Sequence, residues 1–534
     1  MPDLSFREPA TPPLAARLGT LLLCALWLLA GTIGHDPWKA DDALHLGAAF
    51  GIASGDWLVP RIAGEPWLVS PPLYHWVAAA GGKLLGGLLP WHDAARLASA
   101  LFGAALLALL WRFARRQPAG GGSLAAPLLA IGTLGLLVPL HEAQPAIASM
   151  AGFALALLGL LRWRDAPRSG GLLLGAGTGI AFLAAGVDAA VLPPATALLL
   201  LPHPAWRPRG FALAWLAALA TAALIALPWP LLLHAHSPAL FDAWWSGELT
   251  SLTARSVPGR DHLELLAWAS WPVLPLAAWT LWLERRRLFG APNYLPLAAT
   301  LVALAAFLTD APRPTALMPA LVPLTLLAAA GAGRLRRGAA GAFDWFGMMT
   351  FSLVATLIWL GGIAMLTGEP ARLAKNFTKP APGFVAEASP LLLVLAVAVS
   401  LVWVTAMLRT PRSPWRAAAR WSLGLATIWL LLVLLWLPWI DYGKTYRSVS
   451  SEFRHALGKS PGCIARHGLG LAQRASLDYF DGIRTVAGSR AAECRWLIVQ
   501  ATPATPTAQP GWALLRDISR PGDKSERLRL YRRE

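Results

Sequence analysis

The chain has 534 residues, of which 56% are hydrophobic and 14% are charged, and its mean hydropathy is +0.51. A soluble domain carries about 25% charged residues, so this composition excludes an ordinary soluble protein and indicates a polytopic membrane protein. The net charge of +17 would suit nucleic-acid binding in a soluble chain, but the basic residues here lie in short clusters between apolar runs, which excludes that interpretation.

The first apolar segment, at residues 17–34, is the first predicted membrane span. No small-residue cleavage site follows it, so the pattern favours a retained span over a signal peptide, with residues 1–16 on the cytoplasmic side. An acidic stretch, HDPWKADDALH, comes next and contains Asp36, Asp41 and Asp42. An Asp at a helix start often caps the helix, and this is the simpler interpretation of the Asp41–Asp42 pair. Its position at the mouth of a span favours a chemical role.

The stretch PPLYHWVAAAGGKLLGGLLPW at 71–91 is long enough to be a span. Counting it as one would place the arginines that follow on the wrong side and break the alternation of basic loops. We therefore interpret it as a helix lying in the membrane interface, with His75, Trp76 and Lys83 at the water boundary. Residues 35–93 then form one large periplasmic loop that carries the acidic residues.

The remaining predicted spans bring the total to about 13. They lie at residues 94–112, 122–139, 145–161, 170–187, 189–202, 210–233, 264–283, 292–309, 314–333, 343–366, 389–408 and 420–440. Arginine clusters fall in every second connection, which is typical of cytoplasmic loops. These clusters are Arg112/Arg115/Arg116, Arg162/Arg164/Arg168, Arg207/Arg209, Arg285/Arg286/Arg287, Arg334/Arg336/Arg337 and Arg409/Arg412/Arg416/Arg420. The pattern predicts a multi-pass protein of the bacterial inner membrane.

The tail at 441–534 differs in composition from the rest of the chain. It has more charge and contains strand-like runs such as CRWLIVQ and RLRLYRR, so we expect a small periplasmic α/β domain. Cys463 and Cys494 both lie in it. In an oxidising compartment they could form a disulfide worth about 3–4 kcal/mol; two buried free thiols are the alternative. Cys24 is expected to be a small core residue of the first span.

The segment from Asp41 to Trp76 resembles the first external loop of membrane glycosyltransferase family 39, of the GT-C superfamily, which holds the ArnT-like aminoarabinose lipid A transferases and the dolichyl-phosphate-mannose protein mannosyltransferases. The acidic pair, SGDWLVPRIAGEPW and PPLYHW come in the family's order, and ARLASAL follows at 95–101. Later landmarks are ALPWPLLLH at 226–234, WASWPVLPLA at 268–277 and RPTALMPALVPL at 313–324. The resemblance implies an all-α GT-C domain over 17–440 with the small α/β domain over 441–534.

The resemblance also implies a mechanism. In this family the donor is a polyprenyl-phosphate sugar, and an acidic residue acts as general base on the acceptor, which attacks the anomeric carbon with inversion. By resemblance Asp41 is this base, with Asp42 second. Arginines suit the donor phosphate because they bind it bidentately. The external candidates are Arg61, Arg96, Arg255, Arg260 and Arg313. The sugar stays open, and a lipid, a glycan and a protein hydroxyl stay open as the acceptor.

The chain departs from the family pattern at several polar positions. Val69-Ser70 stands in place of an acid–Lys pair, Leu44-His45 in place of Arg and Tyr, and Ala185-Gly186 in place of Lys-Gly. An Asp expected after the third span is absent, and Glu142 could replace it. Because these are phosphate-binding and acidic positions, the departures predict either a different substrate, with Arg61, Arg96 and Arg313 on the phosphate, or loss of activity.

Three histidines raise the question of a metal ion. His234, His236 and His262 lie on or near the predicted external loop 234–263, and neutral imidazoles bind divalent ions. Their spacing matches no strong metal motif, so interfacial histidines without a ligand are the simpler interpretation. A divalent metal ion stays open as the one cofactor considered.

Two other functions stay open at this point. One is a non-catalytic relative that binds a lipid-linked sugar or a partner enzyme, and the other is a lipid flippase or transporter. The predicted spans carry almost no charged residues between their ends. Transporters keep ionisable residues at mid-membrane despite their cost, so this pattern favours chemistry at one surface.

Overall fold

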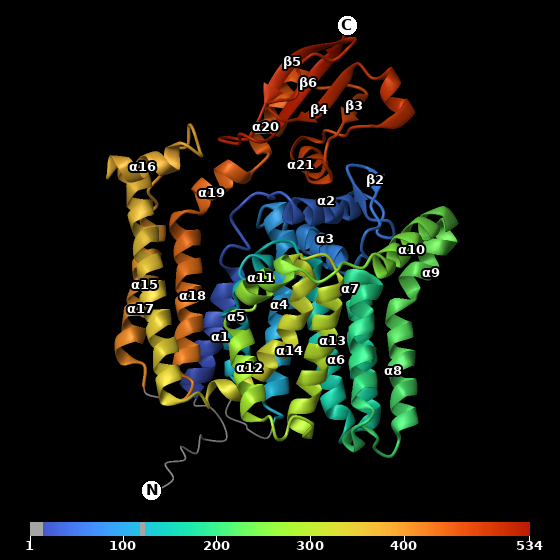
Figure 1. Cartoon of the computed structure of the whole chain (residues 1–534). Coiled ribbons are helices and arrows are strands. Elements are labelled where there is room, and N and C mark those ends of the chain that lie inside the picture. The colour runs from blue at the N-terminus through green and yellow to red at the C-terminus, as the bar shows by residue number, and fades with distance from the viewer. Residues whose placement is uncertain (1–13, 118–122, 412) are drawn as a thin grey trace.

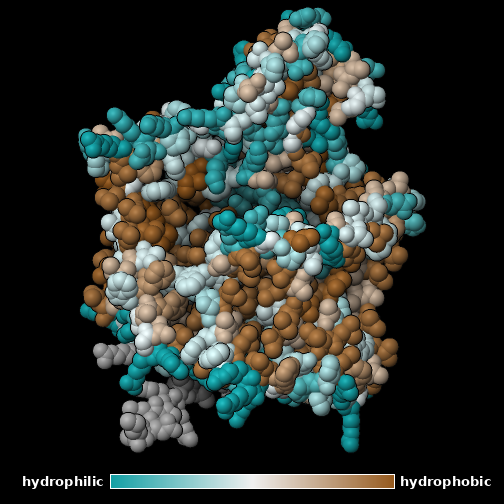
Figure 2. Space-filling view, in the orientation of Figure 1, coloured by the Kyte–Doolittle hydropathy of each residue, from teal (hydrophilic) through white to brown (hydrophobic). Residues whose placement is uncertain are grey.

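The computed structural model describes residues 14–117, 123–411 and 413–534. Most of the predicted cytoplasmic segment 1–16 therefore lies outside the described residues, as do Gly122 of one predicted span and Arg412 of one basic cluster. The described chain forms a bundle of upright helices, a layer of shorter helices across one end of the bundle, and a sheet domain above that layer (Figure 1). An apolar belt covers the visible face of the bundle, and both its lower end and the sheet domain are mainly hydrophilic (Figure 2).

Long runs of Leu and Ala build the bundle, because these residues favour helices and a helix bonds all of its backbone groups internally within lipid. Its helices are α1 (Leu14–Leu29), α4 (Trp91–Ala114), α5 (Ala125–Ile131), α6 (Pro145–Trp163), α7 (Pro167–Leu200), α8 (Phe211–Ala226), α12 (Val273–Leu283), α13 (Ala291–Thr309), α14 (Pro314–Ala332), α15 (Arg337–Thr367), α17 (Pro390–Arg409) and α18 (Arg416–Leu435). Shorter helices at its upper end are α2 (Asp41–Ser54), α3 (Leu73–Leu85), α9 (Pro228–His236), α10 (Pro238–Thr253), α11 (Arg260–Ala269), α16 (Ala371–Thr378) and α19 (Leu437–Lys444). Single 3-10 turns are η1 (Leu134–Leu136), η2 (Pro139–His141) and η3 (Pro204–Trp206).

Every predicted span coincides at least in part with one of these helices. Among the described residues, nine helices are long and apolar enough to cross a membrane, or ten if the bent pair α11–α12 is one span. The difference from about 13 arises because α1 and α5 are short and because α7 contains two predicted spans. The polytopic membrane fold is confirmed, and the exact number of crossings stays a prediction.

The two predicted spans within α7 meet at a break at Ala185–Gly186. Gly186 has a φ of +78°, a backbone conformation that is strained for residues with a side chain but not for glycine. The Glu248 carboxylate of α10 lies against the break and accepts a hydrogen bond from the Val187 N–H at 2.8 Å. A Cβ on Gly186 would displace the Glu248 carboxylate as well as strain the backbone, so both contacts and conformation favour glycine here.

The loop layer, residues 35–93, lies across the upper end of the bundle (Figure 1). Its helices α2 and α3 pack on each other and are connected through two short paired strands, β1 (Arg61–Ile62) and β2 (Glu65–Pro66). At 13 residues α3 is too short to span a membrane, in agreement with the interfacial interpretation. The prediction that His75 lies at the water boundary is wrong: its side chain is fully buried because its ring packs on His45 and Trp67.

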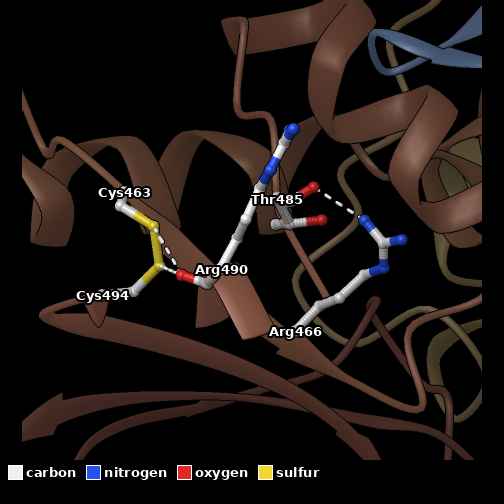
Figure 3. The surroundings of a disulfide bond; sticks show 5 residues. All are labelled: Cys463, Arg466, Thr485, Arg490 and Cys494. Carbon is white, nitrogen blue, oxygen red and sulfur yellow. Dashed lines mark hydrogen bonds between the residues drawn. A yellow bond between two sulfur atoms is a disulfide. The ribbon is translucent and has the colours of Figure 1, made fainter. Parts of the chain in front are cut away.

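The tail forms the expected α/β domain. Its elements are α20 (Arg447–Leu457), β3 (Ile464–His467), α21 (Leu471–Asp481), η4 (Gly488–Glu493), β4 (Trp496–Ala501), β5 (Trp512–Ile518) and β6 (Arg527–Arg533). The sheet order is β3-β4-β6-β5, with β3 and β4 parallel and the other pairs antiparallel. A disulfide joins Cys463, the residue before β3, to Cys494, which lies two residues before β4 (Figure 3).

This domain packs directly on the loop layer. Gly47 of α2 lies so close to α21 that an added Cβ would approach the Ala475 Cβ to 2.5 Å. The Lys39 Nζ lies 3.0 Å from the Glu526 carboxylate, and the Arg474 Nη2 lies 2.6 Å from Glu65. The layer is therefore held between the bundle below and the C-terminal domain above.

Candidate active site

A buried ion cluster fixes the start of α2 onto α4. Asp42 lies in the first turn of α2, and Arg96 lies in α4 one turn after Asp93. The Arg96 Nε and Nη2 donate to the two Asp42 carboxylate oxygens at 3.1 and 3.0 Å, and its Nη1 donates to Asp93 at 2.9 Å. The Arg96 side chain is 0% exposed. Such bidentate charge-assisted bonds are both strong and directional.

Asp42 is fully occupied by this cluster and by the backbone. Its Oδ1 also accepts from the Ala143 N–H at 2.7 Å, and its Oδ2 accepts from the Trp38 N–H at 3.2 Å. Burial alone would raise the pKa of Asp42, but Arg96 outweighs burial and holds this pKa below its usual value. Asp42 and Arg96 therefore position the loop layer, and a substrate phosphate could reach Arg96 only by breaking the cluster.

Asp41, the neighbouring carboxylate, is exposed. No side chain caps α2, so the simpler interpretation of the acidic pair as a helix cap finds no support at Asp41. Its carboxylate accepts a hydrogen bond from the Gln144 Nε2 at 3.3 Å and lines two cavities. The two adjacent acids thus have different environments, one buried and bound, the other open.

The first cavity, which we call the polar cavity, has a volume of about 360 Å³. The loop layer contributes Asp41, His45, Trp67 and Ser70 to its wall. Other polar residues come from α6, α7, the chain after α10 and the turn between α13 and α14: Gln144, Ser149, Asp188, Arg255, Asp310, Arg313 and Thr315.

The second cavity, which we call the apolar cavity, has a volume of about 640 Å³. Its walls are mainly hydrophobic and consist of Leu134, Gly135, Leu137, Val138, Pro139, Trp268 and Pro314, with Glu142 among them. Asp41, Gln144, Arg313 and Thr315 line both cavities. Asp41 and Arg313 therefore lie where the two cavities meet, a place that could bring two bound molecules into contact.

Two of the five arginines predicted to hold a phosphate, Arg255 and Arg313, line the polar cavity. Arg313 is the residue before α14, and its Nη2 lies 3.0 and 3.1 Å from the two carboxylate oxygens of Asp310. Its side chain is 63% exposed, so the guanidinium keeps unused donors for a ligand.

The structure does not bring the other three arginines to either cavity. The Arg96 guanidinium is bonded to the carboxylates of the buried cluster. Arg61 donates to the Gly64 carbonyl at 3.3 Å, and Arg260 pairs with Glu264 at 2.6 Å on an exposed face of α11. The prediction grouped these arginines by external loop, and the fold separates them.

Glu142, predicted as a substitute for the missing Asp, lines the apolar cavity near Asp41. Burial, together with the nearby Asp42 charge, raises the pKa of Glu142 to about 7, while Lys444 lowers it. Lys444, at the end of α19, was missed from the sequence because it lies some four hundred residues from Asp41 along the chain. Its ammonium lies 4.6 Å from the centroid of the Trp38 ring.

The histidines considered for a metal do not converge. The His262 Nδ1 accepts from the Gly259 N–H at 3.2 Å and its Nε2 donates to the Asp310 carbonyl at 2.9 Å, so both ring nitrogens serve the backbone. The His234 ring packs on Phe241. Within residues 14–117, 123–411 and 413–534, no group of three or more His, Cys, Asp or Glu side chains is arranged to hold a metal ion.

The positions that depart from the family pattern gather in one place. Leu44, His45, Val69, Ser70 and Ala185 all line the polar cavity. These residues belong to segments that lie far apart in the sequence. The fold brings them to one cavity, which Asp41 and Arg313 also line.

The chain was compared with known proteins. A family model for dolichyl-phosphate-mannose-protein mannosyltransferase matches residues 69–231. An undecaprenyl phosphate-alpha-4-amino-4-deoxy-L-arabinose arabinosyl transferase of Pseudomonas aeruginosa is 30% identical over 450 residues, which cover 78% of this chain and 75% of the relative. A transferase of the same name, numbered 2, from Pseudomonas fluorescens is 28% identical over 446 residues, covering 78% and 70%.

Solved structures agree with this match. ArnT from Cupriavidus metallidurans bound to undecaprenyl phosphate has a TM-score of 0.73 at 16% identity, covering 97% of this chain and 98% of ArnT. Its apo structure has a TM-score of 0.70 at 17% identity. The fold, with an exposed acid and an arginine lining one cavity, is that of a GT-C membrane glycosyltransferase. The chain belongs to the family of ArnT-like glycosyltransferases.

We predict that Arg96→Met unfolds at a lower temperature than the wild type in detergent. The substitution leaves Asp42 and Asp93 buried without their cation, which costs about 3–5 kcal/mol. Thermal unfolding followed by intrinsic fluorescence measures the change. Arg260→Met is the matched control, since its ion pair is exposed and contributes little. Equal unfolding temperatures for Arg96→Met and Arg260→Met would contradict the structural role of Arg96.

A second prediction concerns pH. The pKa of Glu142 in the folded protein, about 7, is higher than the ordinary value of 4.5. Its contribution to stability is therefore fully present below pH 4.5 and is lost as the pH rises through about 7. Wild type should lose unfolding temperature relative to Glu142→Gln between pH 5 and pH 8. Parallel curves for the two proteins across that range would show that Glu142 is not perturbed.

Proposed function

We propose that the protein is an inverting glycosyltransferase that moves a sugar from a polyprenyl-phosphate donor to a lipid or protein acceptor at the periplasmic face of the bacterial inner membrane. The observation that carries this proposal is the position of Asp41 and Arg313 where the polar and apolar cavities meet. The names of the relatives, undecaprenyl-phosphate arabinosyl transferases, support the class of donor.

The two cavities suit two substrates. The polar cavity takes the sugar-phosphate end of the donor, since Arg255 and Arg313 offer guanidinium groups there. The apolar cavity takes the acceptor, because its Leu, Val, Pro and Trp walls suit the apolar part of a lipid. Both substrates then have their reacting ends beside Asp41.

The reaction follows from this placement. The Asp41 carboxylate takes the proton of the acceptor hydroxyl as the acceptor oxygen attacks the anomeric carbon. The bond between that carbon and the phosphate oxygen breaks, and polyprenyl phosphate leaves with one more negative charge on its phosphate. Arg313 stabilises that charge as it develops. Electrostatic stabilisation of developing charge is the largest single contribution to the rate in many enzymes. Attack opposite the leaving group inverts the anomeric carbon.

Neighbouring residues serve Asp41 in this scheme. Asp42 and Arg96 fix the first turn of α2, and Gln144 holds the Asp41 carboxylate by one hydrogen bond. Glu142, with its pKa of about 7, is a second acid on the acceptor side that exchanges protons readily at neutral pH.

The proposal includes an orientation. The connections that carry the arginine clusters lie at the lower end of the bundle, opposite the C-terminal domain (Figure 1). Arg116, Arg162 and Arg164 line one cavity there. Positive residues remain cytoplasmic, so we infer that this end and the N-terminal segment 1–16 face the cytoplasm, and that the loop 35–93 and the domain 441–534 face the periplasm.

We predict that Asp41→Asn lowers transfer from a polyprenyl-phosphate sugar by about 10²–10⁴-fold, the usual contribution of proton transfer, while donor binding is retained. Radiolabelled sugar transfer in proteoliposomes measures it. Asp261→Asn, an exposed acid at the start of α11, is the matched control and should leave the rate unchanged. Undiminished transfer by Asp41→Asn would contradict Asp41 as the base, whereas binding of the donor without transfer by the wild type would favour a protein that binds the lipid-linked sugar without reacting it.

The orientation has its own test. Alkaline phosphatase fused after Glu534 should be active, because the enzyme matures in the oxidising periplasm, and the same fusion placed after Arg287 should be inactive. Activity in the second fusion and not in the first would reverse the proposed sidedness.

A further inference from the structure

A pair of histidines adjoins Asp41 and has no part in the mechanism above. His45 lies four residues after Asp41 on α2, so the two side chains share one face of the helix, and both line the polar cavity. The His45 Nδ1 lies 3.1 Å from the Nε2 of His75 in α3. The His45 Nε2 has no hydrogen-bond partner among the described residues, and protein atoms do not enclose it. Because His45 lines the polar cavity, this nitrogen faces the cavity.

The burial of His75 decides which nitrogen carries each proton. One proton joins the two rings, and either ring could supply it. The His75 Nδ1 is buried and unpartnered. A proton there would leave a buried N–H donor without an acceptor, which folded proteins avoid more strictly than an unpaired acceptor. His75 therefore carries its proton on Nε2 and donates it to the His45 Nδ1. Hence the proton of His45 is on Nε2, toward the cavity.

Both rings are neutral in this arrangement. Burial lowers the pKa of His45 and of His75, and the charges of Asp41 and Asp42 offset only part of this shift at His45. The His45 N–H is thus a hydrogen-bond donor without a charge.

The surroundings of His45 indicate what such a donor would bind. The two cations of the polar cavity, Arg255 and Arg313, come from other elements, on the side of the α13–α14 turn. Within the described residues, the loop layer contributes no cation to the wall of this cavity; its lining residues are Asp41, Leu44, His45, Trp67, Val69 and Ser70. A phosphate there would face Asp41 without charge compensation, whereas a sugar hydroxyl suits a neutral donor.

We propose that His45 is a specificity-determining residue that donates a hydrogen bond from Nε2 to a hydroxyl oxygen of the donor's sugar, and that His75 is the positioning residue that fixes its tautomer. The proposal rests on the proposed function and deepens it, since it assigns the sugar to the loop-layer wall of the polar cavity and the phosphate to the arginine side.

Binding separates the sugar from its phosphate. The affinity of the full-length protein is measured, without turnover, for undecaprenyl phosphate and for the same lipid bearing 4-amino-4-deoxy-L-arabinose or mannose, the sugars named for the relatives. In His45→Phe, the affinity gained from the sugar should fall about 3- to 10-fold, the value of one neutral hydrogen bond. Affinity for bare undecaprenyl phosphate should not change. His45→Gln, which keeps a side-chain N–H, should retain most of the gain.

Each other outcome overturns a different part of the account. A sugar-dependent gain that is equal in wild type and His45→Phe, or a loss of bare-lipid affinity in His45→Phe, would overturn the role of His45 and leave the proposed function standing. Failure of the wild type to bind any of the three lipids would overturn the proposed function, and the role of His45 with it.

The tautomer has an independent readout. Solid-state NMR of ¹⁵N-histidine protein in lipid bilayers should find His45 with a protonated Nε2 and an unprotonated Nδ1, its signals being assigned by their loss in His45→Gln. In His75→Phe, which removes the donor to Nδ1, His45 should lose this fixed tautomer. Protonation of Nδ1 in the wild type would overturn the arrangement, whether or not transfer is detected.

Discussion

The site depends on one buried guanidinium. Arg96 bonds to Asp42 and Asp93 and also donates to the carbonyls of Thr32 and His35, so it joins α2, α4 and the chain between α1 and α2 at one point. A buried cation of this kind must keep all of its partners, because losing one leaves an uncompensated charge. That requirement fixes the first turn of α2 and leaves Asp41 open at the cavities.

The loop layer is then held from above. The C-terminal domain contacts it through α21 and through ion pairs to Lys39 and Glu65. Asp36, at the start of the layer, pairs with Arg447 and accepts a hydrogen bond from Thr445, both at the start of the C-terminal domain. A domain that is distant in sequence thus contributes to the rigidity of the site, and rigidity is what keeps a base within reach of its substrate.

The sequence predicted the fold class, the family and the open acid, because apolar length, arginine alternation and the motifs around Asp41 are local signals. The resemblance ranked Asp41 before Asp42, but the sequence could not show that Asp42 is buried and fully bonded, because Arg96 and the Ala143 N–H are brought near it only by the fold. For the same reason it grouped Arg61, Arg96 and Arg260 with Arg313. It also missed Lys444 and the burial of His75, because neither position has a local pattern that marks it.

The central claim is that a polyprenyl phosphate binds with its phosphate against the arginines of the polar cavity, which leaves room for the sugar between that phosphate and Asp41. Cryo-electron microscopy of the full-length protein in lipid nanodiscs with undecaprenyl phosphate tests this directly. We expect phosphate density in the polar cavity within hydrogen-bonding distance of Arg313 or Arg255, with Asp41 on the side of the phosphate that the arginines leave open. Phosphate density at a site that neither arginine touches, or at Arg96 with the buried cluster broken, would contradict it.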